Sequence, residues 1–194
     1  MKQSRLIVVV LVLIVLLSFP NLTKGDVPPT IQALAPVAPR SPTGFSDDFS
    51  DPTLKPGWTW VDPLGDCSFS LTANPGHLRL YAPDGGHDLY MNTNAPRMLQ
   101  SIEGDFTVRG KVTINAQYTY QGAGLLIWQD TDNYIRIELN GSQHGINYSH
   151  RLGGVYFDIN PDPPASSYTV YLQFRRTDNT FIASFSNDGS TWQD

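Results

Sequence analysis

Apolar and polar residues alternate with a period of two through much of the chain after Phe45. This pattern is typical of β-strands that bury one face and expose the other. A further run, Leu125–Trp128, is apolar at every position and suits a central strand that is buried on both faces. No segment after Phe45 has the period of a helix. The alternating segments are residues 77–82, 106–114, 135–140 and 169–175.

Short turn-forming sequences separate these segments. Glycine, asparagine and aspartate dominate them, and these residues tolerate the backbone angles that tight turns require. Many short strands at this spacing predict an all-β fold, an antiparallel two-sheet jelly-roll sandwich whose sheets bury their apolar faces against each other. The turn sequences are Asn74-Pro75-Gly76, Asp84-Gly85-Gly86, Asp130–Asn133, Asn140-Gly141, Gly153-Gly154 and Asp188-Gly189.

The final segment reads as the first arm of a hairpin. Residues 180–186 alternate, Asp188-Gly189 supplies a two-residue turn, and a returning strand begins at Ser190, four residues before Asp194. A hairpin arm without a partner can neither pair its backbone nor bury its apolar side chains. We therefore expect a sandwich that lacks its final strands and is less stable than a complete domain.

The first residues predict export. Lys2 and Arg5 precede the apolar run 6–19, which is shorter than the ~20 residues of a membrane span and suits a secretory signal. We assign residues 1–25 to this signal; because no clear cleavage site follows, an uncleaved anchor formed by residues 6–19 is the alternative. Residues 26–44 hold five prolines and predict an extended linker to a domain over residues 45–194.

Charge and cysteine content narrow the classes of partner. The chain has 13 basic and 18 acidic residues, and removal of residues 1–25 takes away three basic and no acidic ones, which changes the net charge from −5 to 10 − 18 = −8. An acidic exported domain is expected to bind nucleic acid and anionic lipid poorly, because these partners carry negative charge. Contact with a membrane is therefore expected only through the anchor. Cys67 is the single cysteine, which we interpret as a small buried residue. The four histidines show no zinc-ligand spacing.

The order of the segments resembles the concanavalin A-like lectin/glucanase superfamily. The resemblance is strongest to the bacterial domain of unknown function 1349 and to the C-terminal modules of family 43 glycoside hydrolases. It implies a curved jelly roll whose closing strand would lie beside Phe45–Phe49. The segments that carry it are FSDDF (45–49), DFTV (105–108), GAGLLIW (122–128), DTDNYIR (130–136), YLQFRR (171–176) and FIASFSNDGSTW (181–192).

Catalytic residues are not predicted. Glucanases of this superfamily place alternate carboxylates on one strand in the order Glu-x-Asp-x-x-Glu, and retaining hydrolysis needs two carboxyl groups about 5 Å apart. Glu138 has no acidic residue two or four positions away, and Glu103 with Asp105 marks a strand entrance. A glycoside hydrolase, or a fragment of one, is therefore the second hypothesis rather than the first.

Aromatic residues predict a carbohydrate-binding surface. Ring faces stack on the apolar faces of sugars, while polar side chains bind the hydroxyl groups. If Trp128, Tyr134, Arg136 and Tyr148 share the concave sheet, they form such a platform, and Tyr118 and Tyr120 flank a bend before Gly122. The alternative is that these rings fill the core of the sandwich.

Asp47 and Asp48 are candidates for one end of a structural calcium site, since calcium takes clustered carboxylate and carbonyl oxygens. The alternative for this pair is a solvated turn. The leading functional hypothesis is an exported, non-catalytic, lectin-like module that binds a polysaccharide or glycoconjugate. The third hypothesis is a structural or adhesion sandwich that binds no sugar.

Overall fold

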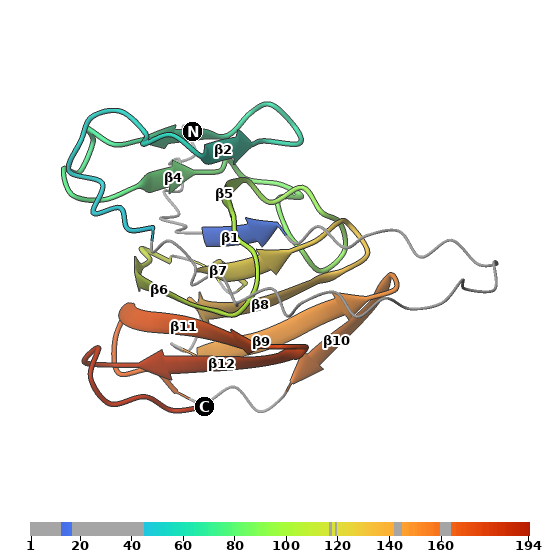
Figure 1. The fold of residues 1–194 in the computed structure, drawn as a ribbon. Helices are drawn as coiled ribbons and strands as arrows, with labels where there is room; N and C mark the ends of the chain where they lie inside the picture. Colours follow the sequence, from blue (N-terminus) through green and yellow to red (C-terminus); the bar gives the residue numbers. More distant parts are fainter. Residues whose placement is uncertain (1–12, 17–44, 117, 119, 142–144, 160–163) are drawn as a thin grey trace, which may run out of the picture.

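The computed structural model describes residues 13–16, 45–116, 118, 120–141, 145–159 and 164–194. All its regular elements are strands, arranged in three sheets (Figure 1). In spatial order, the largest sheet contains β10 (Val155–Ile159), β9 (Gly145–Leu152), β8 (Tyr134–Asn140), β7 (Gly122–Trp128), β1 (Leu13–Leu16), β5 (Arg97–Ser101) and β2 (Trp58–Val61). The second sheet contains β12 (Thr180–Ser186), β11 (Thr169–Thr177) and β6 (Phe106–Thr113), and the third contains β3 (Ser68–Ser70) and β4 (Arg79–Tyr81).

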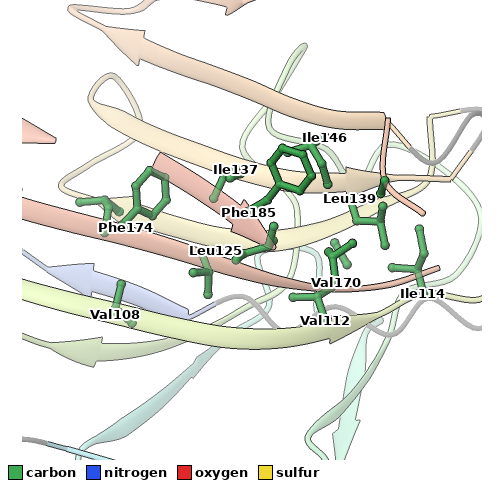
Figure 2. Close-up of a cluster of buried hydrophobic side chains, with 14 of the residues drawn as sticks. Val108, Val112, Ile114, Leu125, Ile137, Leu139, Ile146, Val170, Phe174 and Phe185 are labelled. Carbon is green, nitrogen blue, oxygen red and sulfur yellow. The ribbon is translucent and has the colours of Figure 1, made fainter. Parts of the chain in front are cut away.

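The two larger sheets pack face to face, which confirms the predicted all-β sandwich. Figure 1 shows β6, β11 and β12 lying across the part of the larger sheet that β7–β10 form. Apolar side chains from both sheets meet in one buried cluster, in which Phe174 and Phe185 face Leu125 and Ile137 (Figure 2). Burial of this kind contributes about 25 cal/mol for each Å² of apolar surface, so the cluster is the main source of stability.

Alternation accounts for β6, a strand of the smaller sheet. Phe106, Val108 and Val112 of β6 are buried in the cluster, whereas Thr107 and Arg109 are exposed on the other face. By contrast, β7 is buried along nearly its whole length, as expected for an apolar central strand.

The strand β1 lies between β5 and β7 and runs parallel to both. Residues 13–16 fall within the segment for which the sequence predicts an export signal. The rest of that segment and the predicted linker over residues 26–44 lie outside the described residues. Within the described ranges, no helix has the length and apolar character that crossing a membrane requires.

The returning arm after Gly189 pairs with β12 at one point. Phe185 and Gln193 exchange two backbone hydrogen bonds of 2.9 Å, and the Ser184 hydroxyl donates to Asp194 at 2.6 Å. The aromatic ring of Trp192 lies under the guanidinium of Arg109, 5.0 Å from it. The last residues are thus held against the edge of the smaller sheet.

Candidate functional site

Strand register places a band of polar side chains on the face of the larger sheet that is turned away from the smaller sheet. Arg136 of β8 pairs with Ser149 of β9, and Glu138 pairs with Asn147. Side chains directly opposite each other on paired strands project from the same face. The hydrogen bonds described below add two residues of β10 to this band. We name it the polar face, and it consists of Arg136, Glu138, Asn147, Ser149, Tyr156 and Asp158.

Arg136 lies at the centre of the polar face. Its Nε donates to the Ser149 hydroxyl at 2.6 Å, one terminal nitrogen donates to the Tyr156 hydroxyl at 2.9 Å, and the other lies 3.3 Å from a Glu138 oxygen. Burial disfavours its charge, but Glu138 and Tyr156 outweigh burial and hold the pKa of Arg136 above its usual value. The polar face therefore carries a fixed, largely buried cation.

A second hydrogen-bonded pair continues the polar face toward the edge strand. The side-chain amide of Asn147 donates to Asp158 at 2.7 Å, across β9 and β10. Carboxylate, amide, hydroxyl and guanidinium groups therefore lie on neighbouring strands within a few residues of each other. This is the donor and acceptor set that binds sugar hydroxyl groups.

The loop of residues 82–96, between β4 and β5, forms one rim of the polar face. Asp88 accepts the backbone amides of Tyr90 and Met91 at 2.7 Å, which holds the loop in a tight turn. The Tyr90 ring lies 4.8 Å from the Tyr156 ring and is 55% exposed. The Tyr90 carbonyl accepts a hydrogen bond from Arg151 at 2.8 Å. An exposed aromatic ring thus stands at the border of the hydrogen-bonding groups.

Trp128 and Tyr134 lie on the same face as Arg136 but are covered. Their rings stack at 5.4 Å, and they are 7% and 3% exposed. The Arg97 guanidinium lies 4.2 Å from the Trp128 ring, and the Tyr134 hydroxyl donates to the Leu89 carbonyl. Burial also raises the pKa of Tyr134. The loop 82–96 therefore occupies the position at which these rings would contact a ligand.

Tyr148 lies on the opposite face of the sheet. It pairs with Ile137, so its side chain projects toward the apolar cluster between the sheets. Burial, with a contribution from Asp194, raises the pKa of its hydroxyl to about 12. Trp128, Tyr134 and Arg136 thus share one face of the sheet. Tyr148 projects from the other face, because successive side chains of a strand point to opposite faces.

Tyr118 and Tyr120 are the most exposed of the predicted ligand-binding residues, at 64% and 90%. They precede the first residue of β7, whereas Trp128 is the last residue of that strand. The two tyrosines therefore lie at the other end of β7 from the rings near Tyr90. The predicted ligand-binding aromatic residues therefore do not form one platform. Trp128 and Tyr134 lie on a covered face, Tyr148 projects toward the core, and Tyr118 and Tyr120 lie in a separate loop.

The carboxylates of Asp47 and Asp48 accept hydrogen bonds from residues that follow them closely in the chain. Asp47 accepts the backbone amide of Phe49 at 3.0 Å and the indole N–H of Trp58 at 2.9 Å, and its carboxylate lies 3.3 Å from the Lys55 ammonium. Asp48 accepts the amide and the hydroxyl of Ser50. These bonds curl residues 45–50 into turns instead of the strand that the resemblance implies. The calcium site remains a prediction, and Lys55 supplies positive charge beside Asp47.

Sequence reasoning missed Tyr90, Asn147, Ser149 and Asp158 as members of the site. Alternation in β9 was the available signal, since Asn147, Ser149 and Arg151 occupy every second position. No pattern in the sequence around Tyr90 could place it at the site. Its position depends on a loop that folds back over a strand 44 residues further along the chain, as the contact between Leu89 and Tyr134 shows.

Two facing sheets, antiparallel except at β1, define a β-sandwich with a polar face on the larger sheet. Residues 46–194 match the family described as the beta xylosidase C-terminal concanavalin A-like domain. The chain belongs to this family. The resemblance drawn from the sequence to the C-terminal modules of family 43 glycoside hydrolases is thereby confirmed.

Similar proteins include two curated relatives and several solved structures. The chain is 26% identical over 182 residues to a Vibrio sp. protein named xylan 1,3-beta-xylosidase, covering 90% of this chain and 33% of that protein. It is 27% identical over 159 residues to a putative beta-xylosidase of Escherichia coli strain K12, covering 78% of this chain and 29% of that protein. The chain thus spans about a third of the length of these relatives.

Two structures show the same fold. The GH43 protein BlXynB from Bacillus licheniformis aligns with a TM-score of 0.66 at 20% identity, over 76% of this chain and 29% of that one. Xylan beta-1,4-xylosidase from Bacillus halodurans C-125 aligns with a TM-score of 0.60 at 25% identity, over 81% of this chain and 32% of that one.

Proposed function

We propose that this chain is an exported, non-catalytic carbohydrate-binding module that binds a xylan-type polysaccharide on its polar face. The observation that carries the proposal is the exposed Tyr90 ring at the border of the Arg136 network. A pyranose ring can place its apolar face on Tyr90 while its hydroxyl groups exchange hydrogen bonds with Glu138 and Asp158. The names of the relatives, which refer to xylan and to xylosidases, suggest the class of polysaccharide.

A binding role suits the two carboxylates of the polar face better than catalysis does. Glu138 is paired with the Arg136 guanidinium and Asp158 accepts from Asn147. Each carboxylate therefore already accepts from a neighbouring side chain of the polar face. The charged groups of the polar face are thus suited to hold hydroxyl groups in place.

The proposal is tested by titration calorimetry of the full chain with soluble xylan and with 1,3- and 1,4-linked xylo-oligosaccharides. We expect Tyr90→Ala to weaken binding roughly tenfold through loss of the stacking surface, and Arg136→Gln to weaken it by a similar factor. Matched controls are Tyr118→Ala, an exposed ring at the other end of β7, and Arg175→Gln, an exposed arginine on the smaller sheet. Both should bind as the unaltered chain does.

Two outcomes would overturn the proposal. Absence of binding to any of these glycans, by a chain that unfolds cooperatively, would favour the structural or adhesion hypothesis. Release of reducing sugar that is lost in Glu138→Gln would instead favour the hydrolase hypothesis.

A further inference from the structure

A histidine, a cysteine and an aspartate that are not members of the polar face converge on one point. Asp66 and Cys67 precede β3, and His87 belongs to the loop 82–96. One donor atom of each residue lies within 4.8 Å of the others. Among the described residues, no other three histidine, cysteine or acidic side chains come this close together. Because 20 residues separate Cys67 from His87, short-range spacing gives no sign of the group.

His87 is held with one ring nitrogen directed at this group. Its side chain is 5% exposed, and Nδ1 contacts the Gly85 carbonyl oxygen. A carbonyl oxygen accepts only, so Nδ1 carries the hydrogen and donates it. Nε2 lies 2.8 Å from a carboxylate oxygen of Asp66, which also only accepts, so Nε2 donates to Asp66 in the metal-free chain. Once Nε2 gives up that proton it can bind an ion while Nδ1 still donates to the backbone carbonyl, which is the arrangement that metal-bound histidines show.

Cys67 contributes sulfur in a negatively charged environment. It is partly exposed rather than buried as the sequence suggested, and its Sγ lies 3.6 Å from the Asp66 carboxylate. Asp62 accepts the backbone amide of Cys67 at 2.8 Å. The carboxylates of Asp62 and Asp66 thus both lie beside Cys67, and their negative charges would attract a divalent cation to the same point.

We propose that Asp66, Cys67 and His87 form a site for Zn²⁺ or a cation of similar softness. The ligands are one carboxylate oxygen, the cysteine sulfur and His87 Nε2, with water in the fourth position of a tetrahedron. Sulfur and imidazole ligands favour zinc over calcium or magnesium, which prefer oxygen. On binding, the thiol loses its proton to solvent, and Nε2 also releases one if His87 is charged.

The site would connect two segments of the fold. Cys67 leads into β3, while His87 lies three residues before Tyr90 in the loop 82–96. An ion bound to both segments stabilises the folded state over the unfolded state, because the unfolded chain does not bring the three ligands together. The ion would thus fix the loop that carries the Tyr90 ring.

The test is titration of the full reduced chain with Co²⁺ and then Zn²⁺. Cobalt bound to a thiolate in a tetrahedral site gives a ligand-to-metal absorption in the near ultraviolet and strong bands in the visible region. We expect both absorption features to appear and to saturate at one cobalt per chain. Addition of Zn²⁺ should abolish them, and Zn²⁺ should raise the midpoint of thermal unfolding. Absence of the near-ultraviolet band together with an unchanged midpoint would overturn the proposal.

Three variants assign the ligands. We expect Cys67→Ser, His87→Gln and Asp66→Asn to weaken metal affinity by more than the ~10–100-fold that loss of an outer hydrogen bond costs. Asp66 is exposed, so its substitution should leave the metal-free fold intact and keeps the test valid if another variant unfolds. The matched control is His77→Gln, since His77 is an exposed histidine beside the Pro75 carbonyl. Equal affinity in His87→Gln and in His77→Gln would contradict the assignment.

Discussion

At Gly124 the chain has no room for a side chain. A Cβ built there would lie 1.9 Å from the Ile137 carbonyl oxygen and 2.5 Å from the Glu138 Cα. Both are backbone atoms of β8, so they cannot move without separating β7 from β8. The close approach of these strands also sets the position of Glu138 on the polar face.

We therefore expect Gly124→Ala to lower the free energy of unfolding by about 3 kcal/mol, the upper end of the usual cost of overpacking. Urea unfolding followed by tryptophan fluorescence measures the change. The control is Gly86→Ala, because a Cβ at Gly86 would lie 3.8 Å from the nearest atom, Asn92 Nδ2, and should change little. Equal stability of Gly124→Ala and the unaltered chain would show that the strands can move apart at low cost.

Asp188 stabilises the last turn through its charge. Its carboxylate accepts the backbone amides of Thr191 and Ser190 at 2.8 and 2.7 Å, and these bonds lower its pKa below the ordinary value of 3.8. A carboxylate with a lowered pKa in the folded state stabilises the fold at pH above 3.8. This stabilisation is lost as the pH falls through the lowered value.

Asp188→Asn should therefore be less stable than the unaltered chain at pH 6, and the difference should shrink as the pH falls from 4 toward 2. Thermal unfolding across this range measures it. Asp84→Asn, an exposed aspartate in the loop 82–96, is the control for general charge effects. A difference that stays constant with pH would show that the charge of Asp188 does not stabilise the turn.

Single positions show where sequence reasoning holds and where it fails. Period-two alternation places Arg136 and Tyr134 on one face of β8, and the structure agrees. The same reasoning does not give the exposure of Tyr134, since that depends on which distant segment covers the strand. The sequence also leaves open whether Tyr148 shares a face with Arg136, because that depends on the pairing register of β8 and β9.

The loop 82–96 is the element that decides which rings reach solvent. Arg97, which follows it, is buried, and one of its terminal nitrogens donates to the carbonyls of Thr93 and Ala95 at 2.9 and 3.0 Å. The same guanidinium lies over the Trp128 ring. Arginine can stack and donate at once because its charged group is planar, which a lysine ammonium cannot do.

We expect Arg97→Lys to loosen this loop while the strands persist. Loss of one charge-assisted hydrogen bond corresponds to roughly tenfold faster amide exchange in residues 88–95. Hydrogen exchange with mass spectrometry compares that segment with β11, which should not change. Arg175→Lys, at an exposed arginine of β11, is the matched control. Unaltered exchange in residues 88–95 would mean that Asp88 alone holds the loop.

The strands themselves were largely predictable from the sequence. Alternation located β6, β8 and β11 closely, and the apolar run 125–128 falls within β7. Residues 45–49 differ, because Asp47 and Asp48 bind nearby amides and turn the backbone out of a strand. These short-range hydrogen bonds replace the strand that the family resemblance implies for residues 45–49.

At the scale of the whole molecule, β1 joins two parts of the larger sheet. Val15 pairs with Gln100 of β5 on one side and with Ile127 of β7 on the other. β5 and β7 have no direct pairing with each other in the sheet order. Without β1, the described chain would present two unpaired strand edges, and such edges recruit other chains.

We expect Val15→Pro to displace β1, since proline cannot donate a backbone hydrogen bond to a central strand. The thermal midpoint should fall by roughly 5–10 °C with the loss of a few backbone hydrogen bonds, and the chain should associate at high concentration. Light scattering after size exclusion measures the association. Val15→Ile preserves the N–H group and should behave as the unaltered chain does. A monomeric Val15→Pro chain with an unchanged midpoint would show that β1 contributes nothing to the sheet.

The position of β1 also sets an order of events for an exported chain. Residues 13–16 cannot lie in the sheet and in a translocation channel at the same time, because the sheet engages their backbone on both sides. A chain that folded before export would withdraw part of the export signal that the sequence predicts. Under that prediction, secretion and folding compete for the same four residues, and slow folding favours secretion.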